Sequence, residues 1–148
     1  PVYLFTSNDV ELLGFEGQVI WEINSNFKTT AFSDYVRAEL HSGEYLPRQS
    51  PHRFGLTFDY EWRNLSTNFD WMRYQRQDNV AARESATAGY SMLDATITYH
   101  WRWLANDIAL YLKGENLTDT EARVHTSFLK DLAPRPGRNF SIGIRGNF

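Results

Sequence analysis

The chain has 148 residues, a formal net charge of −3 at pH 7 and no cysteine. The length fits a single domain, the small negative charge gives no electrostatic footprint for nucleic acid, and the lack of cysteine excludes disulfide frameworks and thiol catalysis. Aromatic residues make up 16% of the chain. Because the mean hydropathy is nevertheless −0.51, the chain is aromatic and polar at once, which is typical of membrane barrels.

No apolar run approaches the ~20 residues of a membrane-spanning helix, which excludes helical membrane proteins but leaves barrels open, because barrel strands alternate. The chain begins at Pro1 inside an extended segment, without a Met start or a signal-peptide pattern. We therefore expect a processed protein or a piece of a longer one.

Alternation of apolar and polar residues predicts an all-β protein with strands joined by connections that alternate between short and long. The strands are expected at 2–23, 27–43, 53–63, 67–75, 93–103, 108–115 and 139–148. The short breaks are at 24–26, 64–65 and 105–106, and the long ones at 44–51, 78–90 and 116–138. Outer-membrane barrels have short periplasmic turns and long extracellular loops, so this parity predicts a transmembrane antiparallel β-barrel with its long loops outside.

Seven strands are an odd number, whereas single-chain bacterial barrels use even numbers. A turn at 7–9 would divide the first strand and allow eight strands, but each half would be too short to span a membrane. We therefore expect residues 1–148 to be the last part of a larger barrel.

The pattern of the strand at 27–43 does not decide which of its side chains face the lipid. In one alternative the side chains of Phe32, Val36, Ala38 and Leu40 face the lipid, which would place Asp34 there as well. In the other alternative the lipid-facing residues are Ala31, Ser33 and Tyr35. A β-bulge inside the strand could switch between the two.

In the strand at 67–75, Arg73 and Gln75 stand where the alternation calls for apolar residues, and we expect them to reach the headgroup zone. Aromatic residues gather near the short turns, where membrane barrels carry a girdle at the interface. The expected girdle consists of Trp21, Tyr60, Trp62, Tyr99, Trp101 and Trp103. The alternative interpretation is a soluble core with a tryptophan cluster.

Four histidines are available for metal binding, but no two stand at ligand spacing and no cysteine accompanies them. Only His100, expected in the barrel interior, and His125, in the last long loop, are kept as candidate metal ligands. The simpler interpretation is solvated loop histidines, with His100 hydrogen-bonded to a carboxylate such as Asp94 or Asp59.

Charges of both signs on the polar faces are expected to form cross-strand pairs. Asp59 and Glu61 stand two residues apart, but nothing separates their pKa values or supplies a nucleophile. The sequence therefore predicts neither an enzyme nor a bound cofactor.

The C-terminal strand carries a pattern that is typical of the signal recognised by the barrel-assembly machinery. Ser141, Gly143 and Phe148 fit the polar, glycine and terminal aromatic positions, whereas Gly146 stands where a bulky apolar residue is usual.

With GFEG at 14–17, GENLTD at 114–119 and PRPGRNF at 134–140, all 148 residues resemble the C-terminal part of TonB-dependent receptors. Thr118, where Phe or Leu is usual, and Gly146 depart from that family's pattern. The resemblance implies a twenty-two-stranded barrel of the outer membrane with an N-terminal plug, of which this chain would supply about the last seven strands. Its implied partners are outer-membrane lipid, TonB through an upstream region, and the barrel-assembly machinery. The plug is not expected within these residues.

The run 124–131 resembles the last external loop of the zinc-uptake receptors in that family. The resemblance therefore implies import of a scarce ligand, with zinc or a metal complex first and siderophores or haem next. Two other interpretations remain: a complete eight-stranded barrel with a binding or structural role, and a soluble lipocalin-like binder with its aromatic face inward.

Overall fold

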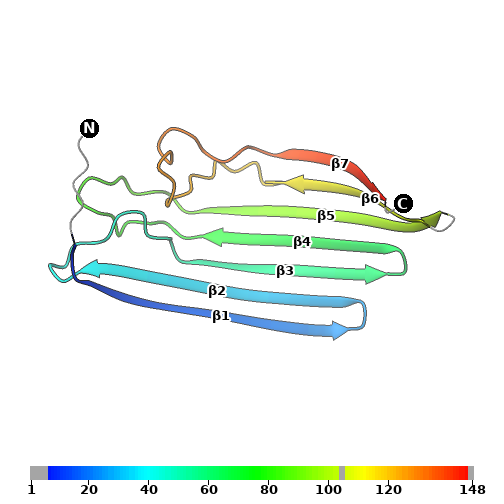
Figure 1. Ribbon diagram of the computed structural model, residues 1–148, viewed down its shortest axis with the longest axis horizontal. Coiled ribbons are helices and arrows are strands. Elements are labelled where there is room, and N and C mark those ends of the chain that lie inside the picture. Colours follow the sequence, from blue (N-terminus) through cyan, green and yellow to red (C-terminus); the bar gives the residue numbers. More distant parts are fainter. Residues whose placement is uncertain (1–6, 104–105, 147–148) are drawn as a thin grey trace.

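In the computed structural model, which describes residues 7–103 and 106–146, the chain forms one seven-stranded antiparallel sheet (Figure 1). The strands are β1 (Val10–Asn24), β2 (Phe27–Leu40), β3 (Arg53–Trp62), β4 (Leu65–Tyr74), β5 (Tyr90–Trp103), β6 (Asn106–Glu115) and β7 (Asn139–Gly146). Each strand pairs with its neighbours in the sequence. The predicted all-β fold is confirmed. Among the described residues, no helix has the length and apolar character needed to cross a membrane.

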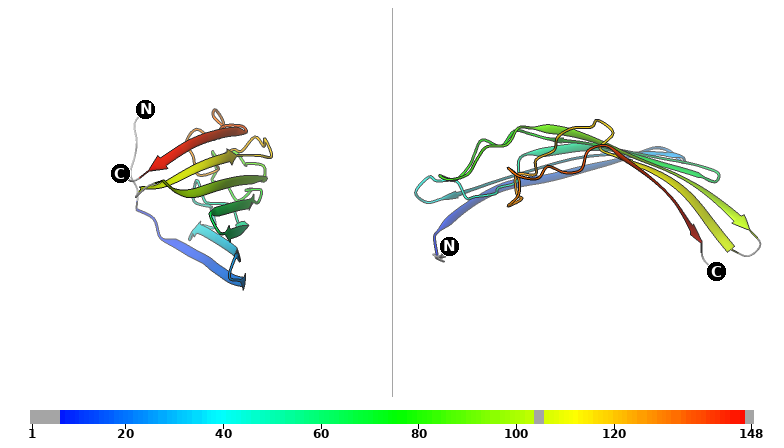
Figure 2. Two further views of the ribbon diagram at one scale, coloured as in Figure 1. Left: turned by 90° about the vertical axis from the view of Figure 1, so that its right-hand side faces the viewer. Right: turned by 90° about the horizontal axis from the view of Figure 1, so that it is seen from above.

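The sheet is curved, and its long connections all lie at one end. Figure 2 shows the strands following an arc when viewed end-on, as expected for part of a barrel wall. The segments 41–52, 75–89 and 116–138, hereafter the long loops, lie at the end where β1 begins (Figure 1). The short turns at 25–26 and 63–64 lie at the opposite end, as do the paired ends of β5 and β6, so the predicted parity of the connections is confirmed.

Several strand boundaries differ from the sequence-based expectation. β1 begins at Val10, so residues 7–9 lie outside the strand, and residues 1–6 lie outside the described part of the chain. β2 ends at Leu40 because a turn follows it, closed by the amide of Gly43 donating to the Leu40 carbonyl at 2.8 Å. The second short turn is Arg63–Asn64, since Trp62 pairs with Leu65.

The strand register creates one apolar side that continues across the whole sheet. A row of directly opposed residues crosses all seven strands on this side: Trp21, Thr29, Phe58, Phe69, Ala95, Gly114 and Phe140. Large side chains on this apolar side are exposed in the isolated sheet, Phe140 to 66% and Ile142 to 73%. An apolar surface this extensive requires lipid or protein cover.

The register of β2 shows which of its side chains lie on the apolar side of the sheet. Ala31 lies opposite Val19 on β1 and Leu56 on β3, both on the apolar side. Asp34 therefore points to the polar side, where Arg53 Nε donates to its two carboxylate oxygens at 2.9 and 2.7 Å. The alternative with Phe32, Val36, Ala38 and Leu40 on the lipid side is wrong, because it would remove Asp34 from this countercharge. The irregularity in pairing lies in β1, between Glu22 and Asn24, and not inside β2.

The polar side carries the cross-strand ion pairs that the sequence predicted. Lys28 Nζ lies 3.3 Å from Asp59 Oδ2, and Arg102 Nε lies 3.1 Å from Asp107 Oδ1. Both pairs join residues directly opposite each other on adjacent strands. They neutralise the polar wall locally and contribute little stability where they are exposed.

The small buried core lies under the long loops. Ala122, from the loop 116–138, packs with Tyr90 and Met92 at the start of β5. The Tyr90 ring stacks on Tyr74 with a centroid separation of 4.6 Å. The long loops are therefore packed structure on the polar side of the sheet.

Candidate functional site

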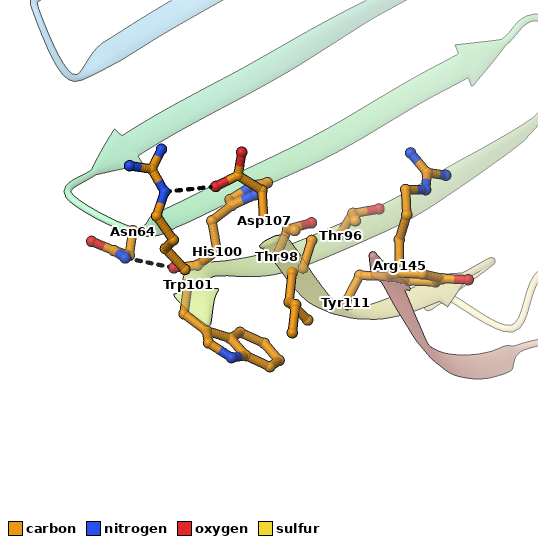
Figure 3. A pocket seen from close by; sticks show the side chains of 11 residues that line it. Asn64, Thr96, Thr98, His100, Trp101, Asp107, Tyr111 and Arg145 are labelled. Atoms are coloured by element: carbon orange, nitrogen blue, oxygen red, sulfur yellow. Dashed lines mark hydrogen bonds and ion pairs between the residues drawn. The ribbon is translucent and has the colours of Figure 1, made fainter. Parts of the chain in front are cut away.

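The end of the polar side near the short turns contains an open pocket of about 750 Å³ (Figure 3). Its polar lining includes His100, Arg102, Asp107, Tyr111 and Arg145. The Asn64 side chain crosses from the neighbouring turn and donates to the His100 carbonyl at 2.6 Å. Trp101, Ile108 and Ala109 also line the pocket, so it is a mainly apolar recess that carries these polar groups, in the wall that would face the barrel interior.

The carboxylates expected beside His100 are engaged elsewhere. Asp94 Oδ1 accepts from the Asn116 amide at 2.7 Å, and Asp59 Oδ1 accepts from Asn68 Nδ2 at 2.8 Å. Asp94 is on the same strand as His100, but six residues separate them, or about 20 Å of extended chain. The expectation of a hydrogen bond between His100 and either carboxylate is therefore wrong.

Two of the sequence motifs meet at the base of the last long loop. Asn116 is 1% exposed, and its Nδ2 donates to the carbonyls of Thr120 and Pro136 at 2.9 and 3.0 Å. Its Oδ1 accepts from the Thr120 amide at 3.0 Å. Asn116 has φ 50°, a left-handed conformation that asparagine tolerates better than most residues.

Asp119 fastens the other end of the same loop. Its Oδ1 accepts from the Arg138 amide at 2.9 Å, just before β7 begins. The N-L-x-D and P-G-R segments therefore form a loop anchor, which holds both ends of 116–138 against the sheet. These hydrogen bonds give both motifs a structural role that involves no ligand.

A cluster of buried ionisable side chains joins two of the long loops. Lys130 Nζ donates to Glu84 Oε1 at 3.1 Å and to the Ser85 carbonyl at 2.6 Å. His125 Nδ1 lies 2.9 Å from Thr87 Oγ1, and His125 Nε2 lies 3.3 Å from Glu84 Oε1. The side chains of Glu84, His125 and Lys130 are 8%, 0% and 7% exposed. We call these three residues the loop cluster.

The remaining long loop, 41–52, contacts the loop cluster through the backbone of Arg48, and the Arg48 side chain contacts an aromatic ring of the loop 116–138. The amide of Arg48 donates to Glu84 at 3.0 and 3.1 Å. Its guanidinium carbon lies 3.1 Å from the centroid of the exposed Phe128 ring. All three long loops are therefore tied together through Glu84 and its neighbours.

Burial and the contacts with Lys130 have opposite effects on the pKa of Glu84 but act together on the pKa of His125. Burial raises the pKa of Glu84, but hydrogen bonds from Lys130 and from the amides of Ala81 and Arg48 outweigh it, so the pKa is lowered. Burial, and next the charge of Lys130, lower the pKa of His125. Glu84 is thus held as a carboxylate and His125 as a neutral imidazole.

Acidification is expected to loosen the long loops. Both pKa values are lower in the folded loops than the ordinary values of 4.5 for Glu84 and 6.5 for His125. Opened loops therefore bind more protons, and packing is lost progressively as the pH falls below about 6.5. Hydrogen exchange of the full-length protein, corrected for intrinsic rates, should show falling protection in 116–138. Protection that is independent of pH down to the ordinary pKa of Glu84 would contradict this expectation.

A second pocket lies on the polar side, beneath the long loops. Its volume is about 280 Å³, and its lining includes Arg53, Tyr74, Tyr90, His125 and Arg135. Arg135 is exposed and makes no ion pair within 7–103 and 106–146, whereas Arg53 is paired with Asp34. We call this recess the loop-side pocket. It combines one unpaired positive charge with two phenol rings.

The two candidate metal ligands are not brought together. His125 contacts Thr87, just before β5 begins, whereas His100 lies near the opposite end of β5. The described residues contain no group of three or more His, Asp or Glu side chains placed to hold a metal ion. Metal ligation by either histidine stays a prediction.

The predicted girdle residues lie on the apolar side. The register places Trp21, Tyr60, Trp62, Tyr99 and Trp101 there. The side chain of Trp103 lies outside the described part of the structure. The role of these residues at a membrane interface stays a prediction.

In the expected assembly signal, Ser141 and Gly143 lie on the polar side of β7. A Cβ atom at Gly143 would collide with the ring of Tyr111 on β6. Phe148 lies outside the described residues, so the assembly signal stays a prediction.

Sequence analysis missed an aromatic group at the other edge of the apolar side. His52 was expected in a solvated loop, but its ring lies 6.1 Å from Phe15, 5.9 Å from Tyr35 and 5.8 Å from Phe54. Its Nε2 lies 2.9 Å from Ser33 Oγ. The available signal was the alternation of β3, which continues back to residue 52.

Comparisons with known proteins agree with this geometry. A family model described as "TonB dependent receptor-like, beta-barrel" matches residues 2–117. Among solved structures, the chain is similar to one named "Copper transporter OprC", with a TM-score of 0.81 and 22% sequence identity over 94% of this chain. The chain covers 24% of the length of that structure. At this identity the likeness shows the fold alone.

Proposed function

Because this chain belongs to the TonB-dependent receptor family of the bacterial outer membrane, we propose that it is part of a receptor that imports a scarce metal as an anionic complex. Its polar side would line the transport path, and its long loops would face the outside. Energy would come from TonB through a part of the receptor outside this chain. The family match does not favour a small eight-stranded barrel or a soluble lipocalin-like binder.

The charge of the loop-side pocket is the observation that carries this choice of cargo. Arg135 has no anionic partner within the described residues, and Tyr74 and Tyr90 supply aromatic faces beside it. A bare divalent cation would be repelled by this charge, whereas an anionic complex would form charge-assisted hydrogen bonds with the guanidinium. Siderophore-like and haem-like complexes share these properties.

Free zinc is the second candidate, supported by the resemblance of 124–131 to the loop of zinc-uptake receptors. The side chain of His125 is 0% exposed: its Nδ1 lies 2.9 Å from Thr87 Oγ1, and its Nε2, which has no hydrogen-bond partner among the described residues, lies 3.3 Å from Glu84 Oε1. Zinc binding there would require the loop cluster to open. Copper enters as a further metal to test, because a structure with the same fold carries that name.

The substitution Arg135→Glu is expected to lower uptake of an anionic metal complex at least about tenfold, since hydrogen bonds to charged groups contribute about 1.5–3 kcal/mol. The measurement is accumulation of radiolabelled metal by cells that produce the full-length receptor, with zinc, copper or iron supplied free or as a citrate complex. Arg83→Glu is the matched control, because Arg83 is an exposed long-loop arginine that does not line the loop-side pocket.

A strain without TonB should lose uptake in every arm of this experiment. If free zinc is taken up equally well by wild type and by Arg135→Glu, the cargo is the ion and the proposed complex is wrong. If no metal is accumulated in any form, metal import itself is rejected.

A further inference from the structure

Arg73 is the one charged residue on the apolar side of β3 to β7 within the described part of the chain. The register places it opposite Phe54 on β3 and Ser91 on β5, both on that side. Trp71 precedes it on the same face and packs against Phe54 with ring centroids 5.7 Å apart. The guanidinium of Arg73 is therefore carried on the surface that faces the membrane.

No carboxylate of residues 7–103 or 106–146 lies within ion-pair distance of Arg73. Its Nη1 instead donates to Ser91 Oγ at 3.3 Å, and the side chain is half-buried. An arginine on the lipid face of a barrel costs about 2–4 kcal/mol at the bilayer midplane and about 0–1 kcal/mol near the interfaces. Its depth in the membrane therefore decides what it contacts.

The depth of Arg73 follows from its place in β4. Eight residues separate it from Leu65 at the short-turn end, which corresponds to about 27 Å along the strand and about 20 Å along the membrane normal at a tilt near 40°. The apolar band of such barrels is about 25 Å tall. The rings of Tyr35, His52 and Phe54 lie at the same edge, as aromatic residues do at membrane interfaces. The backbone of Arg73 thus lies about 5 Å below the outer edge of that band, from where its long side chain can reach the outer-leaflet headgroups.

We propose that Arg73, assisted by Ser91, binds a phosphate group on a lipid of the outer leaflet. The planar guanidinium matches phosphate through two parallel hydrogen bonds, and the Ser91 hydroxyl already holds it in position. The ligand is a lipid, because the site is continuous with the apolar side and its neighbours are aromatic rings that suit acyl chains. This site is separate from the cargo path, which lies on the opposite side of the sheet.

The test uses the full-length receptor purified in detergent, with native mass spectrometry to measure bound diphosphoryl lipid A. Arg73→Gln is expected to lower lipid retention about tenfold, the loss of a charge-assisted pair. Arg63→Gln is the matched control, since Arg63 lies in the short turn at the other end of the same hairpin and stacks on Trp62. It should retain lipid like the wild type.

Two further probes identify the source of the phosphate. Dephosphorylated lipid A should bind about equally weakly to wild type and to Arg73→Gln, and inorganic phosphate alone should not bind measurably. Equal retention of diphosphoryl lipid A by wild type and Arg73→Gln would overturn the proposal, as would binding of inorganic phosphate that depends on Arg73. If Arg73→Gln fails to assemble, Arg73→Lys decides. Lysine keeps the positive charge but lacks the two parallel donors of the guanidinium. Lipid A retention equal to that of the wild type would therefore contradict the proposal, and reduced lipid A retention would support it.

Discussion

Replacing Lys130 by methionine is expected to destabilise the packing of the long loops by about 3–5 kcal/mol, the cost of leaving a buried charge without its partner. Glu84 would keep its carboxylate in a site where its side chain is 8% exposed and where Lys130 Nζ now lies 3.1 Å away. The Ser85 carbonyl would also lose a donor. Hydrogen exchange of the full-length receptor should show faster opening in 75–89 and 116–138, while the strands stay protected.

A double-mutant cycle isolates the interaction between Lys130 and Glu84. Combining Lys130→Met with Glu84→Gln should cost clearly less than the sum of the single substitutions, because no charge is then left unpaired. Arg76→Met is the control, since Arg76 and Asp78 form a pair exposed to 67% and 58%. It should change loop stability by less than about 1 kcal/mol. Unchanged exchange in Lys130→Met would show that the loop cluster does not hold the loops.

The substitution Asn116→Ala is expected to destabilise the attachment of the last long loop by about 2–4 kcal/mol, because several buried polar groups would lose their partners together. The carbonyls of Thr120 and Pro136 would lose a donor, and the Thr120 amide would lose an acceptor. Alanine also accepts the φ of 50° less readily than asparagine. The midpoint of heat-modifiable mobility of the full-length receptor should fall.

Two other variants sharpen the test of Asn116. Asn116→Asp keeps the acceptor oxygen but replaces the donor by a buried carboxylate oxygen that faces two carbonyls, so at neutral pH it should lower the midpoint at least as much as Asn116→Ala. Asn79→Ala is the matched control, because Asn79 is also a long-loop asparagine but uses its backbone amide in its hydrogen bond to Gln77. A midpoint shift of equal size in Asn79→Ala would show that the loop anchor has no special role.

The strands and their facing were predictable because they depend on a local pattern. A period of two residues fixes which side chains share a side of a sheet, and one buried side enforces the register. Strand β3, with Phe54, Leu56 and Phe58 on one side, shows this in the sequence and in the structure. The facing of strand β2 could not be predicted in this way, because its apolar residues fall on both sides of the sheet. The side that its residues face is shown by the pairing of Asp34 with Arg53, which lies on another strand.

The loop cluster could not be predicted, because periodicity carries no information in irregular segments. Glu84 and Lys130 are 46 residues apart in the sequence, and Thr87 and His125 are 38 apart. Only the fold of the loops brings them together. His125 was singled out as a candidate metal ligand, which stays a prediction; its contacts with Thr87, Glu84 and Lys130 were not predictable from the sequence.

The motifs that carry the family resemblance were recognised, but their physical role was not. Asn116 and Asp119 have positive φ values and serve as hydrogen-bonding centres for the ends of one loop. Side-chain to backbone bonds of this kind depend on where the chain returns, here at Pro136 and Arg138. The sequence therefore identified the right residues, and the structure supplies the reason for them.

The most direct test of the barrel wall is the accessibility of single cysteines along β5, introduced into a full-length receptor without other cysteines. Spin labels at positions 93, 95 and 97 should respond to oxygen, which dissolves in lipid. Labels at 94, 96 and 98 should respond to a water-soluble nickel chelate. Strict alternation in outer-membrane vesicles is the predicted result. Uniform access to the chelate, or alternation of the opposite phase, would contradict the assignment of the apolar side to the membrane.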